Sequence, residues 1–119
     1  MVTWRAIIED VRIDFHYIHI EPTPTLEVHA QKTFDSLAHL ISGLDPAGAA
    51  LLKLEFARST QHHNKGMVYQ AKAQLVMPKQ TFRAEADAED MHAALDALKH
   101  TLVRLVERHK EQVQKHHAA

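Results

Sequence analysis

The feature that most constrains the fold is a change of hydrophobic period in the second half of the chain. Apolar and polar residues alternate over residues 67–77, and the alternation resumes over residues 82–88. Successive side chains of a strand point to opposite faces, so this pattern predicts two half-buried strands. Pro78-Lys79-Gln80 separates them at the spacing of a hairpin turn.

After this hairpin, apolar residues recur every three or four positions, which predicts a long helix with one buried face. The positions on that face are Met91, Ala94, Leu95, Leu98, Leu102, Leu105, Val106, His109 and Val113. Asp87 is placed to cap the helix. Glu89 and Asp90 add negative charge to its first turn, where the helix dipole favours it.

The N-terminal residues predict one further strand and leave a short segment open. Residues 11–17 alternate as a strand, and Ile18 and Ile20 then shift the phase, which predicts a bulge or a change of face. Residues 1–10 either extend this strand or pack as a separate arm.

A first helix and a second strand follow. Thr23 before Pro24 fits an N-cap followed by the first helical residue, and the apolar period then runs as far as Gly43. Residues 52–56 alternate as a strand, and residues 58–65 are polar and without period, which predicts a loop. The order strand, helix, three strands, helix favours an α+β sandwich, in which both helices cover one face of a four-stranded sheet.

Composition excludes several classes of protein. The chain has no cysteine, which excludes disulfides and thiolate metal sites. It has neither an apolar run long enough for a membrane span nor a secretory signal, so we expect a cytoplasmic protein without a membrane partner. The formal net charge is −1 at pH 7, so the basic excess typical of nucleic-acid binders is missing.

A family resemblance is nevertheless present in the second half. It is carried by Lys65-Gly66, Tyr69, the Pro78 turn, Phe82 with Ala84, the run from Ala88 to Leu102, and Arg104. In these residues the chain resembles the short form of the bacterial ribosome hibernation-promoting factors, the ribosome-associated inhibitor A family, over about residues 11–110.

The resemblance implies a β-α-β-β-β-α fold like that of double-stranded RNA-binding domains. It also implies binding to rRNA of the small ribosomal subunit, in the channel where tRNA and mRNA would lie, and hence silencing of idle ribosomes under stress. Neither a cofactor nor a small-molecule substrate is expected. Longer relatives append a second domain that pairs ribosomes; here residues 111–119 form only a short tail, and we expect a monomer.

Such a role needs cations that meet rRNA phosphates, because A-form RNA is recognised mainly through its backbone. On a wheel of the second helix Arg104, Arg108 and Lys115 share one flank, and Lys99 lies on the other. Arg104 and Arg108 match basic positions of the family. The expected RNA-binding residues are Arg104, Arg108, Lys99, Lys115, Lys65, Lys32 and Arg58. The alternative is a solvated charged face of an ordinary helix.

The first helix departs from the family pattern. Relatives tend to place lysine and arginine where this chain has Glu27, Thr33, Ser36 and His39, and Thr101 replaces a further basic residue. We therefore expect weaker and less salt-dependent binding than in a basic relative. An alternative function is a protein-interaction or stress module that keeps the fold and has lost its affinity for rRNA.

Eleven histidines allow a third function, a histidine-rich metal-responsive protein. The adjacent pairs 62–63 and 116–117 would diverge in extended backbone, so we expect no metal site. His39, His92 and His100 could supply cationic charge on mild acidification, or they could simply reflect composition. No nucleophile-elbow or phosphate-loop motif is present, and His92 with Asp96 reads as a surface pair, so we expect no enzymatic activity.

Overall fold

The computed structural model describes residues 2–8, 11–44, 48–59 and 68–118, and the side chains of residues 11–44, 48–58 and 69–112. Within these ranges seven helices and strands follow one another along the chain. They are β1 (Val2–Ile8), β2 (Val11–Ile18), α1 (Pro24–Leu44), β3 (Leu51–Ser59), β4 (Val68–Val76), β5 (Thr81–Ala88) and α2 (Met91–Ala118).

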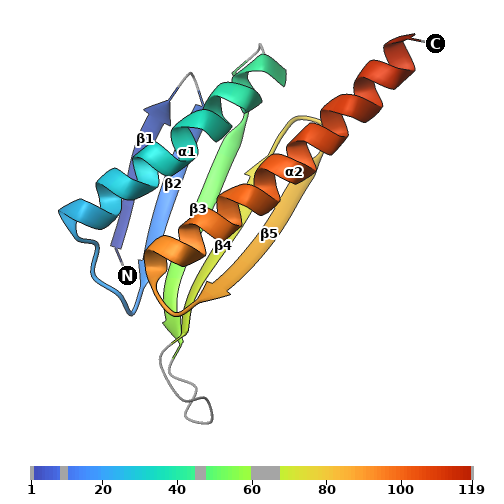
Figure 1. The fold of residues 1–119 in the computed structure, drawn as a ribbon. Helices are drawn as coiled ribbons and strands as arrows, with labels where there is room; N and C mark the ends of the chain where they lie inside the picture. The colour runs from blue at the N-terminus through green and yellow to red at the C-terminus, as the bar shows by residue number, and fades with distance from the viewer. Residues whose placement is uncertain (1, 9–10, 45–47, 60–67, 119) are drawn as a thin grey trace.

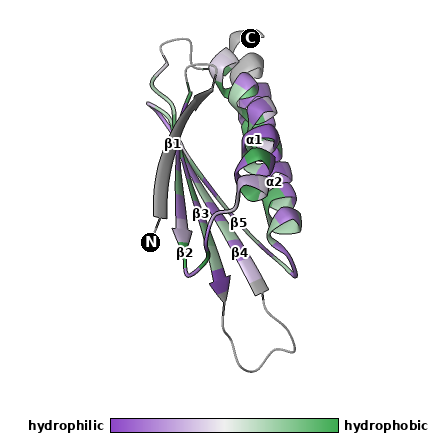
Figure 2. Cartoon of the chain, turned by 90° about the vertical axis from the view of Figure 1, so that its left-hand side faces the viewer, coloured by the Kyte–Doolittle hydropathy of each residue, from purple (hydrophilic) through white to green (hydrophobic). Residues whose placement is uncertain are grey.

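The strands form one sheet in the order β1-β2-β3-β4-β5. β2 and β3 are parallel because α1 crosses back over the sheet between them, and all other neighbours are antiparallel. Both helices lie on the same face of the sheet and leave the opposite face open (Figures 1 and 2). The predicted α+β sandwich with both helices on one face of the sheet is confirmed, and so is the order strand, helix, three strands and helix from β2 onward.

The sheet has one strand more than the predicted four. Residues 2–8, left open by the sequence, form β1, which pairs antiparallel with β2 from Val2 opposite Tyr17 to Ile8 opposite Val11. β2 would otherwise be an edge strand with unpaired backbone groups, and β1 satisfies them. These residues are therefore a strand of their own.

The core lies between the sheet and the two helices. β2 buries every second residue from Val11 to Tyr17, as its alternation predicted. The ring of Phe56 on β3 lies 5.3 Å from that of Tyr17, between ring centroids. The buried residues of α2 are Met91, Ala94, Leu95, Leu98, Leu102 and Val106, all on the predicted apolar face. The side chain of Val113 lies outside the described residues.

The two helix starts test the capping predictions. At α1 the Thr23 hydroxyl accepts a hydrogen bond from the Leu26 amide at 3.1 Å, so the predicted N-cap is confirmed. The prediction of Asp87 as the cap of α2 is wrong. Strand β5 continues to Ala88, and the Asp90 carboxylate accepts the hydrogen bond from the Ala93 amide at 2.8 Å.

Other boundaries differ by a few residues from the predicted ones. His19 has a φ of 57°, and this left-handed residue ends β2, which explains the shifted phase of Ile20 without a bulge in the strand. Arg58 and Ser59, predicted as the start of a loop, continue β3. Residues 111–118, expected as a tail, form the last turns of α2.

The predicted hairpin turn is confirmed. The Met77 amide donates to the Gln80 carbonyl at 2.9 Å, and the Gln80 amide donates back to the Met77 carbonyl at 3.3 Å. This turn fixes the register of β4 against β5, so that Gln74 lies opposite Arg83 and Lys72 opposite Glu85.

Candidate nucleic-acid interface

Arg104 and Arg108 occupy the exposed flank of α2 that faces away from α1. Both side chains are exposed, and since they are four residues apart they lie one above the other on the helix surface. Glu107 lies three residues after Arg104, and Glu111 lies three residues after Arg108. Among the described residues, however, no salt bridge engages either arginine. Both guanidinium groups are therefore available to an external anion.

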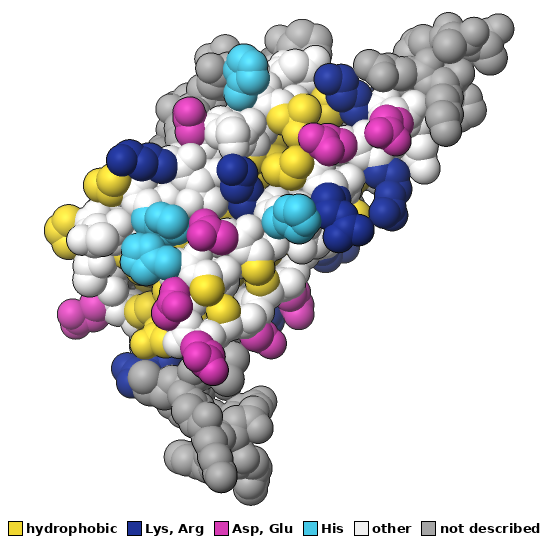
Figure 3. Space-filling model, in the orientation of Figure 1, with side chains coloured by type: hydrophobic (Ala, Val, Ile, Leu, Met, Phe, Trp, Pro, Cys, Tyr) yellow, Lys and Arg dark blue, Asp and Glu magenta, His cyan; other side chains and the backbone are white. Residues whose placement is uncertain are grey.

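The charge on the helical face is uneven. Figure 3, which views this face, shows lysine and arginine gathered toward the C-terminal half of α2, with acidic side chains among them and further acids and histidines over the rest of the face. Within their bounds α2 carries five lysines and arginines against three acids, and α1 carries one lysine against two acids. Of the two helices, α2 is therefore the one with a positive region.

Of the other predicted RNA-binding residues, Lys99, Lys32 and Arg58 do not lie beside the two arginines. Lys99 is half-buried on the flank of α2 that faces α1, and Lys32 is exposed on α1. Arg58 is exposed at the far end of β3, beside the start of α2 rather than its end (Figure 1). Lys65 lies outside the described residues, and Lys115 lies in α2 with its side chain outside them.

One departure of α1 from the family pattern has no bearing on RNA. Thr33 is only 7% exposed and belongs to the buried face of α1, so this position does not face a ligand in this chain. Ser36 and His39 are exposed, and Glu27 is half-buried. The positive charge of the family pattern is therefore missing from the surface of α1 at Glu27, Ser36 and His39.

Between the two helices lies a cluster that the sequence did not predict. The His29 imidazole on α1 is 3.2 Å from the Asp96 carboxylate on α2, and its ring centroid is 4.4 Å from that of His92. Helical spacing pairs Asp96 with His92, one turn away, but the carboxylate contacts His29, 67 residues away along the chain. Local spacing carries no signal for such a pair.

The other histidine of α2 near the core has a structural role. His109 is half-buried, and its ring lies edge-on to that of Phe82 at 5.4 Å between centroids, as expected for a helix residue on the apolar face. In the part of the chain that the structure describes, no three histidines and acids form a group that could hold a metal ion. No helix there is both long and apolar enough to cross a membrane.

Comparison with known proteins agrees with this fold. A search of the curated proteins found no match. The N-terminal domain of Protein Y from Thermus thermophilus superposes with a TM-score of 0.60 at 20% sequence identity, covering 79% of this chain and 93% of that one. A ribosomal subunit interface protein from Coxiella burnetii superposes with a TM-score of 0.59 at 18% identity, covering 82% and 97%.

At such identities the likeness shows the shared fold, and the family follows from the sequence. The family model described as sigma 54 modulation protein / S30EA ribosomal protein matches residues 13–114, which include β3, β4, β5 and both helices up to the last turn of α2. Strand β1 lies outside this match. The chain therefore belongs to the sigma 54 modulation protein / S30EA ribosomal protein family, whose members are ribosome-associated.

Proposed function

We propose that this protein binds rRNA of the small ribosomal subunit, in the channel of tRNA and mRNA, and silences idle ribosomes under stress. It acts in the cytoplasm as a bound monomer and by occupancy, without catalysing a reaction. The family match, which spans both helices and the sheet from β2 to β5, carries this proposal.

The exposed flank with Arg104 and Arg108 supplies the contact. Phosphate contacts position a protein on RNA without reading its sequence, and arginine offers a planar set of donors to phosphate oxygens. Since neither arginine has a salt bridge among the described residues, binding RNA would not require an existing pair to be broken. Because α1 carries few cations, we expect the protein to contact few phosphates. Its affinity for the small subunit should therefore decrease only slightly as the salt concentration rises.

Co-sedimentation with purified small subunits at low and high salt tests this proposal. The variant with Arg104→Glu and Arg108→Glu should lose binding at both salt concentrations. Single Arg→Gln variants should each reduce the slope of log affinity against log salt by about 0.7–0.9. A matched control reverses two exposed cations on other surfaces, Lys79→Glu with Arg12→Glu, and should still bind.

If the arginine variant sediments with the subunit as well as the control does, α2 is not the RNA contact. If the unaltered protein itself fails to sediment with the small subunit at low salt, the result favours the second candidate function, a protein-interaction module of the same fold. The acidic and neutral surface of α1 is the observation that favours this second candidate.

A further inference from the structure

The open face of the sheet, opposite the helices, carries two parallel rows of polar side chains that cross β3, β4 and β5. Strand register aligns the members of each row. The first, here called the cationic row, is Lys53, Gln74 and Arg83. The second, here called the acidic row, is Glu55, Lys72 and Glu85.

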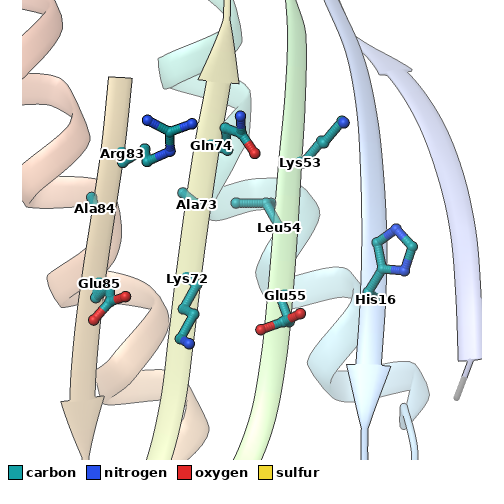
Figure 4. A pocket seen from close by; sticks show the side chains of 10 residues that line it. All are labelled: His16, Lys53, Leu54, Glu55, Lys72, Ala73, Gln74, Arg83, Ala84 and Glu85. Atoms are coloured by element: carbon teal, nitrogen blue, oxygen red, sulfur yellow. The ribbon is translucent and has the colours of Figure 1, made fainter. Parts of the chain in front are cut away.

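The two rows form the sides of a hollow. It has a volume of about 360 Å³, and the backbones of Leu54, Ala73 and Ala84 form its floor, since their side chains point to the core. Figure 4 shows the cationic row at one end and the acidic row at the other. In the part of the chain that the structure describes, no salt bridge engages a charge of either row.

Along the two outer strands, β3 and β5, the charge changes sign from the first row to the second. On β3 Lys53 is followed on the same face by Glu55, and on β5 Arg83 is followed by Glu85. Residues two apart on a strand are about 7 Å apart. Each outer strand of the hollow, β3 and β5, thus presents a positive and a negative group that are separated by one two-residue repeat of the strand.

We propose that a second copy of this chain docks on this face, sheet against sheet. The two copies are related by a twofold axis that lies between the sheets, perpendicular to the strands and midway between the two rows. This axis places the cationic row of each copy on the acidic row of the other. Lys53 then faces the second copy's Glu55, and Arg83 faces the second copy's Glu85. Each contact occurs twice, as symmetry requires in such an interface.

Apolar groups continue this complementarity beyond the rows. Leu51 and Ala57 are half-buried on the open face of β3, one on each side of the hollow. The same axis places Leu51 against the second copy's Ala57. Aligned sheets pack about 10 Å apart with a rotation of about 30°, which leaves room for the side chains of both copies.

A different partner, single-stranded RNA, fits this face less well. Proteins that bind single strands stack the bases on aromatic side chains. Among the described residues that point outward from β2 to β5, none is phenylalanine, tyrosine or tryptophan. The carboxylates of the acidic row would also lie beside the phosphates, whereas a second copy meets both Glu55 and Glu85 with a cation.

The small area of the face limits the strength of the association. Strands β2 to β5 present roughly 500 Å² at standard strand spacings, less than the roughly 800 Å² per partner of a typical stable interface. The dimer is therefore weak, and because charge pairs hold it, salt weakens it further. It belongs to the free protein, and its test needs no ribosome, so it stands or falls separately from RNA binding by α2.

Sedimentation velocity of the full chain, from ~10 µM to ~500 µM at low and high salt, measures this association. The unaltered protein should dimerise with concentration at low salt and less so at high salt. Lys53→Glu with Arg83→Glu makes the face acidic, and Glu55→Lys with Glu85→Lys makes it basic, so each variant alone should be monomeric. A control, Lys32→Glu with Lys110→Glu on the helical face, should dimerise as before.

Two further samples separate complementarity from loss of folding. An equimolar mixture of the acidic-face and basic-face variants should form a heterodimer, and the fourfold exchange of all these charges should restore the homodimer. A monomeric protein at every concentration would overturn the proposal. Failure of the mixture to associate would also overturn it. The same holds if the protein binds a short single-stranded RNA and the variant with Lys53→Glu and Arg83→Glu does not.

Discussion

Replacing Asp90 by alanine tests where α2 begins. The Asp90 carboxylate accepts the amide hydrogen bond of Ala93 at 2.8 Å, and its carbonyl accepts that of Ala94 at 3.1 Å, so Asp90 is the N-cap. Loss of an aspartate N-cap typically costs about 1 kcal/mol of stability. The carboxylate also meets the positive end of the helix dipole, which adds ~0.3 kcal/mol or more at an exposed site.

We therefore expect the free energy of unfolding to fall by roughly 1–1.5 kcal/mol for Asp90→Ala. With a urea dependence of about 2 kcal/mol per molar, the midpoint measured by far-ultraviolet circular dichroism should fall by roughly 0.5–0.8 M. Asp90→Asn keeps an oxygen acceptor and should lose clearly less.

Asp87→Ala is the matched control. Asp87 is exposed on β5, opposite Gln70, and its replacement should change stability by less than about 0.5 kcal/mol. If Asp87→Ala lowered the midpoint as much as Asp90→Ala or more, the helix would start at the cap that the sequence suggested, and the assigned end of β5 would be wrong.

Three further perturbations have expected outcomes. Leu98→Ala removes a fully buried side chain of α2 and should lower stability by about 2–5 kcal/mol in urea unfolding, whereas half-buried Val103→Ala should lose less. Gly48 has a φ of 71°, so Gly48→Ala should cost about 1–2 kcal/mol, while Gly43→Ala, in a helix with open space around it, should raise stability by up to about 1 kcal/mol in the same assay. If histidines restore phosphate contacts, binding to small subunits should be tighter at about pH 6 than at about pH 7.5. Glutamine at His39, His92 and His100 should then abolish that difference, and an unchanged pH response would contradict the switch.

The sequence by itself determined the elements from β2 to α2 and their order, but not β1. Periods of two and of about 3.6 residues are local consequences of backbone geometry, so the buried residues of β2 and α2 could be read directly. The cap at Thr23 and the turn at Pro78-Lys79-Gln80 were likewise local. The same periodicity sufficed to place Arg104 and Arg108 on an exposed flank of α2, because a helix wheel needs only the spacing of residues.

Only the tertiary structure decided how these elements meet. The pairing of β1 with β2, the contact of His29 with Asp96 and the burial of Thr33 all join segments distant in the sequence. The end of β5 was misjudged because pairing with β4 carries the strand past Asp87 to Ala88. The hairpin turn sets the register of β4 against β5, but the two rows of the open face also need the register of β3 against β4, which depends on hydrogen bonding between strands that no local period encodes.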